Sequence, residues 1–189
     1  MPGDLKLFVV DTGPLITLAV AQSLDYLLYV NADVVIPDAV LHEATADAAR
    51  LGAEDIIDWV KAHRNRIEIA PTKVYQIFDA ARLAIPGLRE PDLGERAAVE
   101  VIEEPSRLLG DERGLLLCEE TAILRRVVVR DRRRIVELST LDFLRLLEAE
   151  HLIQSAEQVF ELAANAGRTR SRVEKLQIHD EKARLAIRA

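Results

Sequence analysis

The chain has 189 residues, of which 49% are hydrophobic and 30% are charged, and its formal net charge is −7. This size and balance are typical of one globular domain with a sizeable core, and the apolar runs are too short to span a bilayer. A single cysteine excludes an intrachain disulfide and a multi-cysteine metal site. With no signal-peptide pattern at the start, we expect a cytoplasmic protein, and the acidic charge argues against a surface coated for nucleic acid.

Short apolar runs of β type alternate with helical runs along the chain. Strands are expected at residues 5–10, 32–37, 66–71 and 114–120, and a last one in either 126–129 or 133–138. Helices are expected at residues 14–24, 24–30, 38–51, 53–63, 74–84, 94–104, 119–126, 139–152, 155–167 and 170–187. The alternation predicts an α/β fold with a central parallel sheet and helices on both faces.

The first strand, "LKLFVV", ends at Asp11 and is followed at once by Thr-Gly-Pro. Proline suits the first turn of a helix, and we expect Thr12 or Gly13 to cap the helix that follows. In the same way, Asp38 is expected to be the N-cap of the helix after the second strand. Ligands of parallel sheets bind beyond the carboxyl ends of the strands, which is where this Asp11 lies.

Further acids recur at comparable places along the chain. Glu43 follows the second strand by one to two helical turns, Glu95 opens the helix after "PDLG", and Glu119 and Glu120 follow "GLLLC" directly. If these carboxylates converge, two of them about 4 Å apart repel by roughly 4 kcal/mol at an effective dielectric near 20. Shared protons or a divalent cation would relieve this cost, and oxygen ligands favour Mg²⁺ or Mn²⁺.

Five segments then resemble the successive motifs of the PIN-domain superfamily, nearest to the VapC-like toxin ribonucleases. They read "VVDTGPLITLA", "VVIPDAVLHEAT", "DLGERAAVEVI", "GLLLCEETAILR" and "STLDFLRLLEAEHLI", and the resemblance covers about residues 5–153. It implies a three-layer sandwich around a parallel sheet. We expect a PIN-like nuclease domain at 1–153 and a C-terminal helical extension at 154–189, packed on the domain or at a dimer interface.

The resemblance also implies cleavage of single-stranded RNA with Mg²⁺ or Mn²⁺, leaving a 5′-phosphate and a 3′-hydroxyl. The family's acids fall on Asp11, Glu43, Glu95 and Glu119. Relatives tend to read "LLIDD" where this chain reads "LLLCEE", so a glutamate replaces the fourth aspartate, and the choice between Glu119 and its neighbour Glu120 stays open.

Each of these acids is expected to have a distinct role in catalysis. Asp11 and Glu95 are expected to bind the metal directly or through water, Glu119 to complete the cage, and Glu43 to orient the attacking water or act as its base. Thr12 is expected to hold a water or a phosphate as well as, or instead of, capping the helix. Arg125 and Arg126 are the expected substrate-binding residues, although each of them has the ordinary reading of a solvated charge.

Two functions are therefore carried forward. The first is a metal-dependent endoribonuclease, the toxin of a toxin–antitoxin pair, with an antitoxin protein and a second copy of the chain as partners. The second is a PIN-like module that binds RNA or protein with weakened catalysis, because "CEE" departs from the usual pattern and the net charge is −7. A flap-cleaving deoxyribonuclease is disfavoured, since residues 72–92 are too short for an arch insertion.

Overall fold

The computed structural model describes residues 4–119 and 134–168. Five strands form one all-parallel sheet in the order β3-β2-β1-β4-β5. Their bounds are β1 Leu5–Val10, β2 Val34–Pro37, β3 Ile67–Ala70, β4 Arg113–Leu117 and β5 Ile135–Leu138. The helices are α1 Thr12–Val20, the 3₁₀ helix η1 Leu24–Tyr29, α2 Asp38–Thr45, α3 Ala53–Ala62, α4 Lys73–Ala84, α5 Leu93–Glu103, α7 Thr140–Ala149 and α8 Ala156–Asn165. The predicted α/β fold with a central parallel sheet is confirmed.

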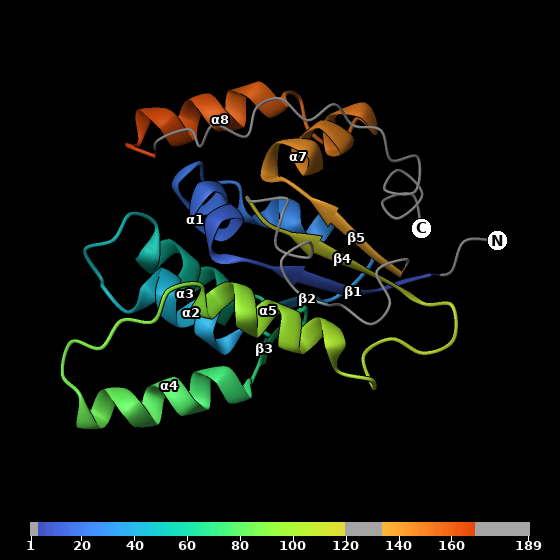
Figure 1. Cartoon of the computed structure of the whole chain (residues 1–189). Helices are drawn as coiled ribbons and strands as arrows, with labels where there is room; N and C mark the ends of the chain where they lie inside the picture. The colour runs from blue at the N-terminus through green and yellow to red at the C-terminus, as the bar shows by residue number, and fades with distance from the viewer. Residues whose placement is uncertain (1–3, 120–133, 169–189) are drawn as a thin grey trace.

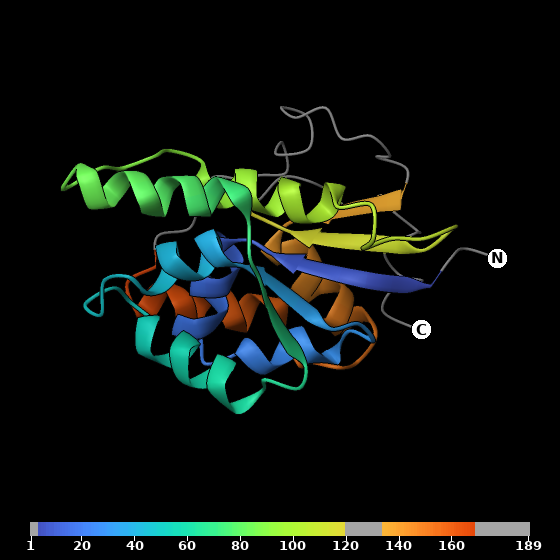
Figure 2. The same cartoon turned by 90° about the horizontal axis from the view of Figure 1, so that it is seen from below.

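Helices cover both faces of this sheet (Figure 1). On one side, α5 packs against β1 and β2, and α4 packs on the outside of α5. On the other side lie α1, α7 and α8, which share one core with the sheet. Seen from below, β1 and β4 point the same way, toward the end where α1 begins (Figure 2). This end is therefore the carboxyl edge of the sheet, where a ligand site is expected.

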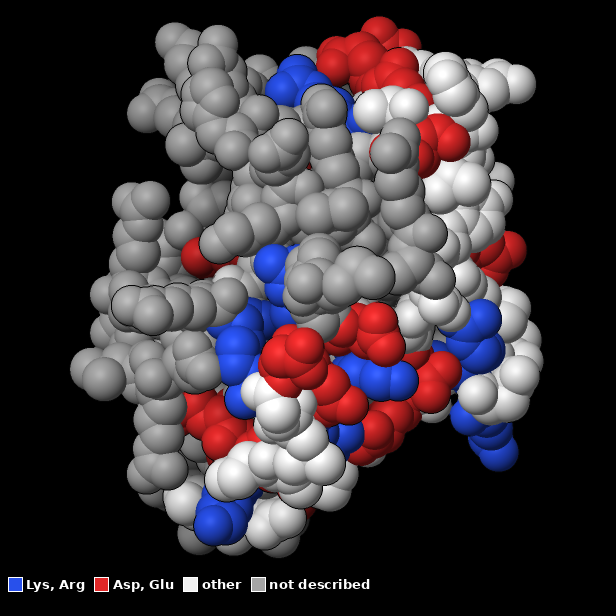
Figure 3. Space-filling model, turned by 90° about the vertical axis from the view of Figure 1, so that its right-hand side faces the viewer, with Lys and Arg blue, Asp and Glu red and all other residues white. Residues whose placement is uncertain are grey.

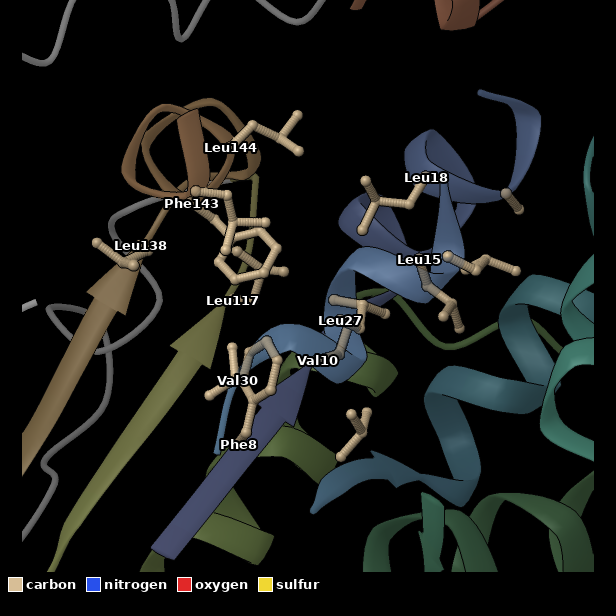
Figure 4. Close-up of a cluster of buried hydrophobic side chains, with 14 of the residues drawn as sticks. Phe8, Val10, Leu15, Leu18, Leu27, Val30, Leu117, Leu138, Phe143 and Leu144 are labelled. Carbon is tan, nitrogen blue, oxygen red and sulfur yellow. The ribbon is translucent and has the colours of Figure 1, made fainter. Parts of the chain in front are cut away.

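The larger core is built from apolar side chains of the strands and of the helices on the α1 side. Phe8 of β1 and Phe143 of α7 are both fully buried, with ring centroids 5.7 Å apart. Leu15 and Leu18 of α1 belong to the same buried cluster as these rings (Figure 4). Because strand β1 is buried on both faces, its sequence reads as a nearly continuous apolar run rather than an alternation.

Two sequence expectations for helix α2 change in detail. Helix α2 ends at Thr45, whereas a helix that ends just before Gly52 was expected. Pro37 occupies the N-cap position of α2, and Asp38 is its first helical residue. The Asp38 carboxylate instead accepts hydrogen bonds from the amides of Ala39 and Thr72 and from the Thr72 hydroxyl. The expectation that Asp38 caps α2 was therefore wrong, because its side chain ties α2 to the chain leaving β3.

The end of the sequence is described in part. Of the two candidates for the last strand, the later one is β5, Ile135–Leu138. Helix α8 contributes Val159 and Ala163 to the core that contains β1, and it packs against α1 and α7. The expected helices at 119–126 and 170–187 fall wholly or mainly outside the described residues, so the division at residue 153 stays a prediction. In the described ranges, none of the helices has the length and apolarity needed to cross a membrane.

Candidate functional site

The carboxyl edge of the sheet brings the four predicted acids into one region. Asp11 follows β1 directly, and its backbone amide donates to the carbonyl of Leu117 over 2.9 Å, which extends the β1–β4 ladder by one residue. Glu43 comes from α2, Glu95 from the first turn of α5, and Glu119 from the second position after β4. The backbone of Asp11 is thus fixed by the sheet, while the other three acids arrive from separate elements.

The other three acids are close enough to Asp11 to affect its charge. Burial is the largest cause that raises the pKa of Asp11 from 3.8 to about 7. The charges of Glu43, Glu95 and Glu119 contribute to this rise, and the hydrogen bond with the Thr12 backbone opposes it. The ionised form of Asp11 is therefore disfavoured at the centre of a negative region, and a nearby cation would favour it.

Glu43 is held by two donors from different parts of the chain. The Thr12 hydroxyl donates to Glu43 Oε2 over 2.9 Å, and the amide of Gly94 donates to Glu43 Oε1 over 3.1 Å. A Cβ at Gly94 would lie 2.7 Å from Glu43 Oε2 and 3.1 Å from Thr12 Oγ1. Glycine at position 94 therefore lets the start of α5 approach the carboxylate closely enough to bind it.

Glu119 is held in a comparable way on the α1 side. The Thr17 hydroxyl donates to Glu119 Oε1 over 2.6 Å, and Arg168 Nη2 donates to Glu119 Oε2 over 3.1 Å. A Cβ at Gly13 would come within 2.8 Å of the Glu119 Cδ atom, so a glycine is again required for the close approach. Both carboxylate oxygens of Glu119 are thus engaged by other side chains.

The donor set fits a hard divalent cation in its chemistry. It consists of carboxylate oxygens in a region where added negative charge is costly, as the raised pKa of Asp11 shows. Within residues 4–119 and 134–168, no three His, Cys, Asp or Glu side chains already stand in an arrangement that could hold a metal. Cation binding would therefore have to draw the carboxylates together, including oxygens of Glu43 and Glu119 that now accept hydrogen bonds.

The remaining predicted site residues differ in outcome. Asp11, not Thr12, occupies the N-cap position of α1, and Thr12 is the first helical residue. The capping role expected of Thr12 was therefore wrong, because its hydroxyl binds Glu43. Glu120, Arg125 and Arg126 lie outside the described residues.

Sequence reasoning missed three groups that contact the acids: Thr17, the amide of Gly94, and Arg168. The arginine lies just after the expected helix at 155–167, yet it binds Glu119, which is 49 residues away in the chain. No local pattern reveals such a pairing, since it depends on how α8 packs. The sequence did contain a hint for Gly94. Glycine disfavours a helix, so its presence at the start of one, next to Glu95, suggests another reason for it.

Cys118 and Glu137 lie beside the acids. The Cys118 thiol is 3.4 Å from Glu137 Oε1, and burial together with the charges of Glu137, Asp11 and Glu95 raises the pKa of this thiol. Cys118 is therefore a neutral, buried side chain next to Glu119 in the chain.

The opposite edge of the molecule has a different character. Figure 3 looks at the side where the strands begin, and there basic and acidic side chains are mixed. Arg66, for example, lies 3.3 Å from Asp33 and also donates to the carbonyls of Val30 and Ala32. In the described part of the chain, charges of both signs thus lie at this edge, in contrast to the carboxylates at the carboxyl edge.

Comparison with known proteins adds one finding. A family model described as a PIN domain matches residues 7–114. The match runs from β1 to the beginning of β4, so it includes Asp11, Glu43 and Glu95 and stops before Glu119. No curated protein and no solved structure matches the chain.

Proposed function

Since the chain belongs to the PIN-domain family, whose members are typically metal-dependent nucleases, we propose that it is an endoribonuclease that hydrolyses phosphodiester bonds in single-stranded RNA. The observation that carries the proposal is the electrostatic state of Asp11. The sheet fixes the backbone of this residue at its carboxyl edge, and burial together with three other acids disfavours the charge of its carboxylate. A group so placed has a ready use as a ligand for a cation.

In this proposal Asp11 and Glu95 hold Mg²⁺ or Mn²⁺, with Glu119 as a further ligand. The bound cation would lower the pKa of a water and neutralise charge on the phosphate. Glu43 orients the attacking water or accepts its proton, and its two donors, Thr12 and Gly94, fix the direction of its carboxylate. Thr12, Arg125 and Arg126 are proposed to contact the substrate.

The test is cleavage of a fluorescent single-stranded RNA by the purified chain with Mg²⁺ or Mn²⁺. Asp11→Asn keeps the size of the side chain and removes its charge, so it should abolish cleavage without unfolding the protein. Glu68→Gln is the matched control, because Glu68 lies on β3 and pairs with Arg107 rather than with the acids. Wild-type cleavage by Asp11→Asn would remove the basis of the proposal.

A binding module with weakened catalysis is the second candidate. It is favoured by Glu119, whose two oxygens are both engaged by Thr17 and Arg168, and by the lack of a preformed metal cage among the described residues. Calorimetric titration with Mn²⁺ separates the two functions. Absence of heat at millimolar metal, together with retained RNA binding, would favour the module over the enzyme.

We also propose that the nuclease is the toxin of a toxin–antitoxin pair and acts as a homodimer, on the strength of its motif resemblance to VapC-like ribonucleases. Expression of the wild type should then arrest growth of a bacterial host, whereas Asp11→Asn should not. Light scattering of the purified chain measures the mass in solution. Growth unaffected by an active nuclease would argue against a toxin, and a monomeric mass would argue against the dimer.

A further inference from the structure

Arg168 reaches the proposed site from the far end of the described chain. Its Nη2 donates to Glu119 Oε2 over 3.1 Å and to the carbonyl of Gly13 over 3.3 Å, and its Nε donates to Thr17 Oγ1 over 3.2 Å. The side chains of Arg168 and Glu119 are 28% and 24% exposed, so the pair is partly shielded from water. Three acceptors on two separate segments thus hold one guanidinium group.

The local backbone aims Arg168 at this place. Helix α8 ends at Asn165, and Gly167 adopts a φ of +96°, a conformation that side chains rarely allow. The amide of Arg168 then donates to the carbonyl of Ala163, which closes the end of the helix. Because α8 packs on α1, this turn directs the side chain toward Gly13 and Thr17 on α1.

The guanidinium does for Glu119 what a divalent cation would do. It places positive charge at one carboxylate oxygen, while the Thr17 hydroxyl donates to the other over 2.6 Å. A metal ion that binds Glu119 directly needs at least one of these oxygens, and two cations cannot share one oxygen without strong repulsion. Arg168 and the metal are therefore alternatives at this carboxylate.

We propose that Arg168 is a built-in competitor of the divalent cation: it neutralises Glu119 in the metal-free protein and must leave before Glu119 can join the metal site. This inference rests on the proposed metal site, but not on cleavage. The end of α8 would then regulate metal binding, since any event that moves residues 167–168 changes the number of carboxylates available to the cation.

The first measurement is Mn²⁺ affinity by calorimetry on the full chain. Arg168→Gln should tighten Mn²⁺ binding about three- to tenfold, the range expected for loss of a partly buried ion pair. Arg168→Lys keeps the charge and should stay near wild type. Arg66→Gln is the matched control, because Arg66 likewise has three acceptors, in its case one carboxylate and two carbonyls, but lies at the opposite edge, and it should leave the affinity unchanged.

A thermodynamic cycle distinguishes competition from a general change in charge. In a Glu119→Gln background, Arg168→Gln should no longer tighten Mn²⁺ binding, whereas an effect of charge alone would persist there. With a chelator present and no added metal, Arg168→Gln and Glu119→Gln should each lower the melting temperature. The melting temperature of the double mutant should fall by less than the sum of these two decreases.

Gly167→Ala offers a variant that keeps every charge. The new Cβ has space, with Leu51 Cδ1 at 3.4 Å as its nearest neighbour, but the positive φ disfavours alanine, so the turn that aims Arg168 is weakened. It too should tighten Mn²⁺ binding. Unchanged or weaker binding by both Arg168→Gln and Gly167→Ala would overturn the competition.

The outcomes separate this inference from the proposed function. If the wild type cleaves RNA and Arg168→Gln binds Mn²⁺ no more tightly, the inference fails and the nuclease stands. If Mn²⁺ binds more tightly to Arg168→Gln but neither form cleaves RNA, the nuclease fails and the competition stands. If Mn²⁺ binds to neither form, both are wrong.

Discussion

Substitution of Gly94 by alanine tests how finely Glu43 is positioned. The new Cβ would lie 2.7 Å from Glu43 Oε2, whereas ordinary contacts begin at 3.4 Å, so this oxygen must retreat by about 0.7 Å. The carboxylate then loses its alignment with the Gly94 amide and the Thr12 hydroxyl. Misplacement of a catalytic group by about 1 Å can cost about 10²-fold in rate. We therefore expect cleavage of single-stranded RNA to fall by about 10- to 100-fold in Gly94→Ala.

Stability should change little in this variant, since two effects oppose each other. Alanine favours the helix by about 1 kcal/mol over glycine, and the clash is with the end of a flexible side chain. Gly114→Ala is the matched control, because its Cβ would come equally close, 2.8 Å, to Ile135 Cδ1 near the amino end of β4. It should cleave at nearly the wild-type rate. Full activity in Gly94→Ala beside an inactive Glu43→Gln would refute the argument that the glycine sets the geometry of Glu43.

Three further changes probe the core, a buried polar contact and the acid cluster. Phe143→Ala removes a fully buried ring that packs on Phe8 and should cost about 3–5 kcal/mol in the free energy of unfolding, measured with urea. Asp38→Ala leaves the buried Thr72 hydroxyl and amide without their acceptor; it should cost about 1–3 kcal/mol, with Mn²⁺ affinity unchanged by calorimetry. Asp11→Asn should melt higher than the wild type at pH 8 in chelator: the pKa of Asp11 rises from 3.8 to about 7 on folding, so wild-type stability falls as the pH rises through this range. Near pH 4 the two proteins should melt together, and Mn²⁺ at pH 8 should stabilise only the wild type.

The order and type of the elements could be predicted because the sequence separates them sharply. The apolar run of β1 ends at Asp11, and Pro37 and Gly52 mark the ends of a strand and of a turn region. The length of α2 could not be predicted, since residues 46–52 are helix-compatible in composition yet leave the helix after Thr45. The periodicity of apolar residues identifies which face of a helix is buried, but tertiary contacts decide at which residue the helix ends.

The acids of the candidate site were predictable as a group, whereas their partners were not. Asp11 and Glu119 follow strands, Glu95 lies in the first turn of a helix, and Glu43 follows β2 by one to two helical turns. The topology of the sheet brings these positions to one edge. The donors that orient them depend on close approaches between elements, such as α5 against α2 at Gly94 or α8 against α1 at Arg168. Such pairings follow from packing angles, which no local pattern of residues encodes.

The contacts of Glu119 explain why a glutamate suits position 119. An aspartate there would have one methylene less, and its carboxylate would stand over an ångström nearer the backbone. The longer side chain of Glu119 lies across Gly13 and reaches both Thr17, 2.6 Å away, and Arg168, 3.1 Å away. The added reach of the glutamate thus brings one of its oxygens to the Thr17 hydroxyl and the other to the Arg168 guanidinium.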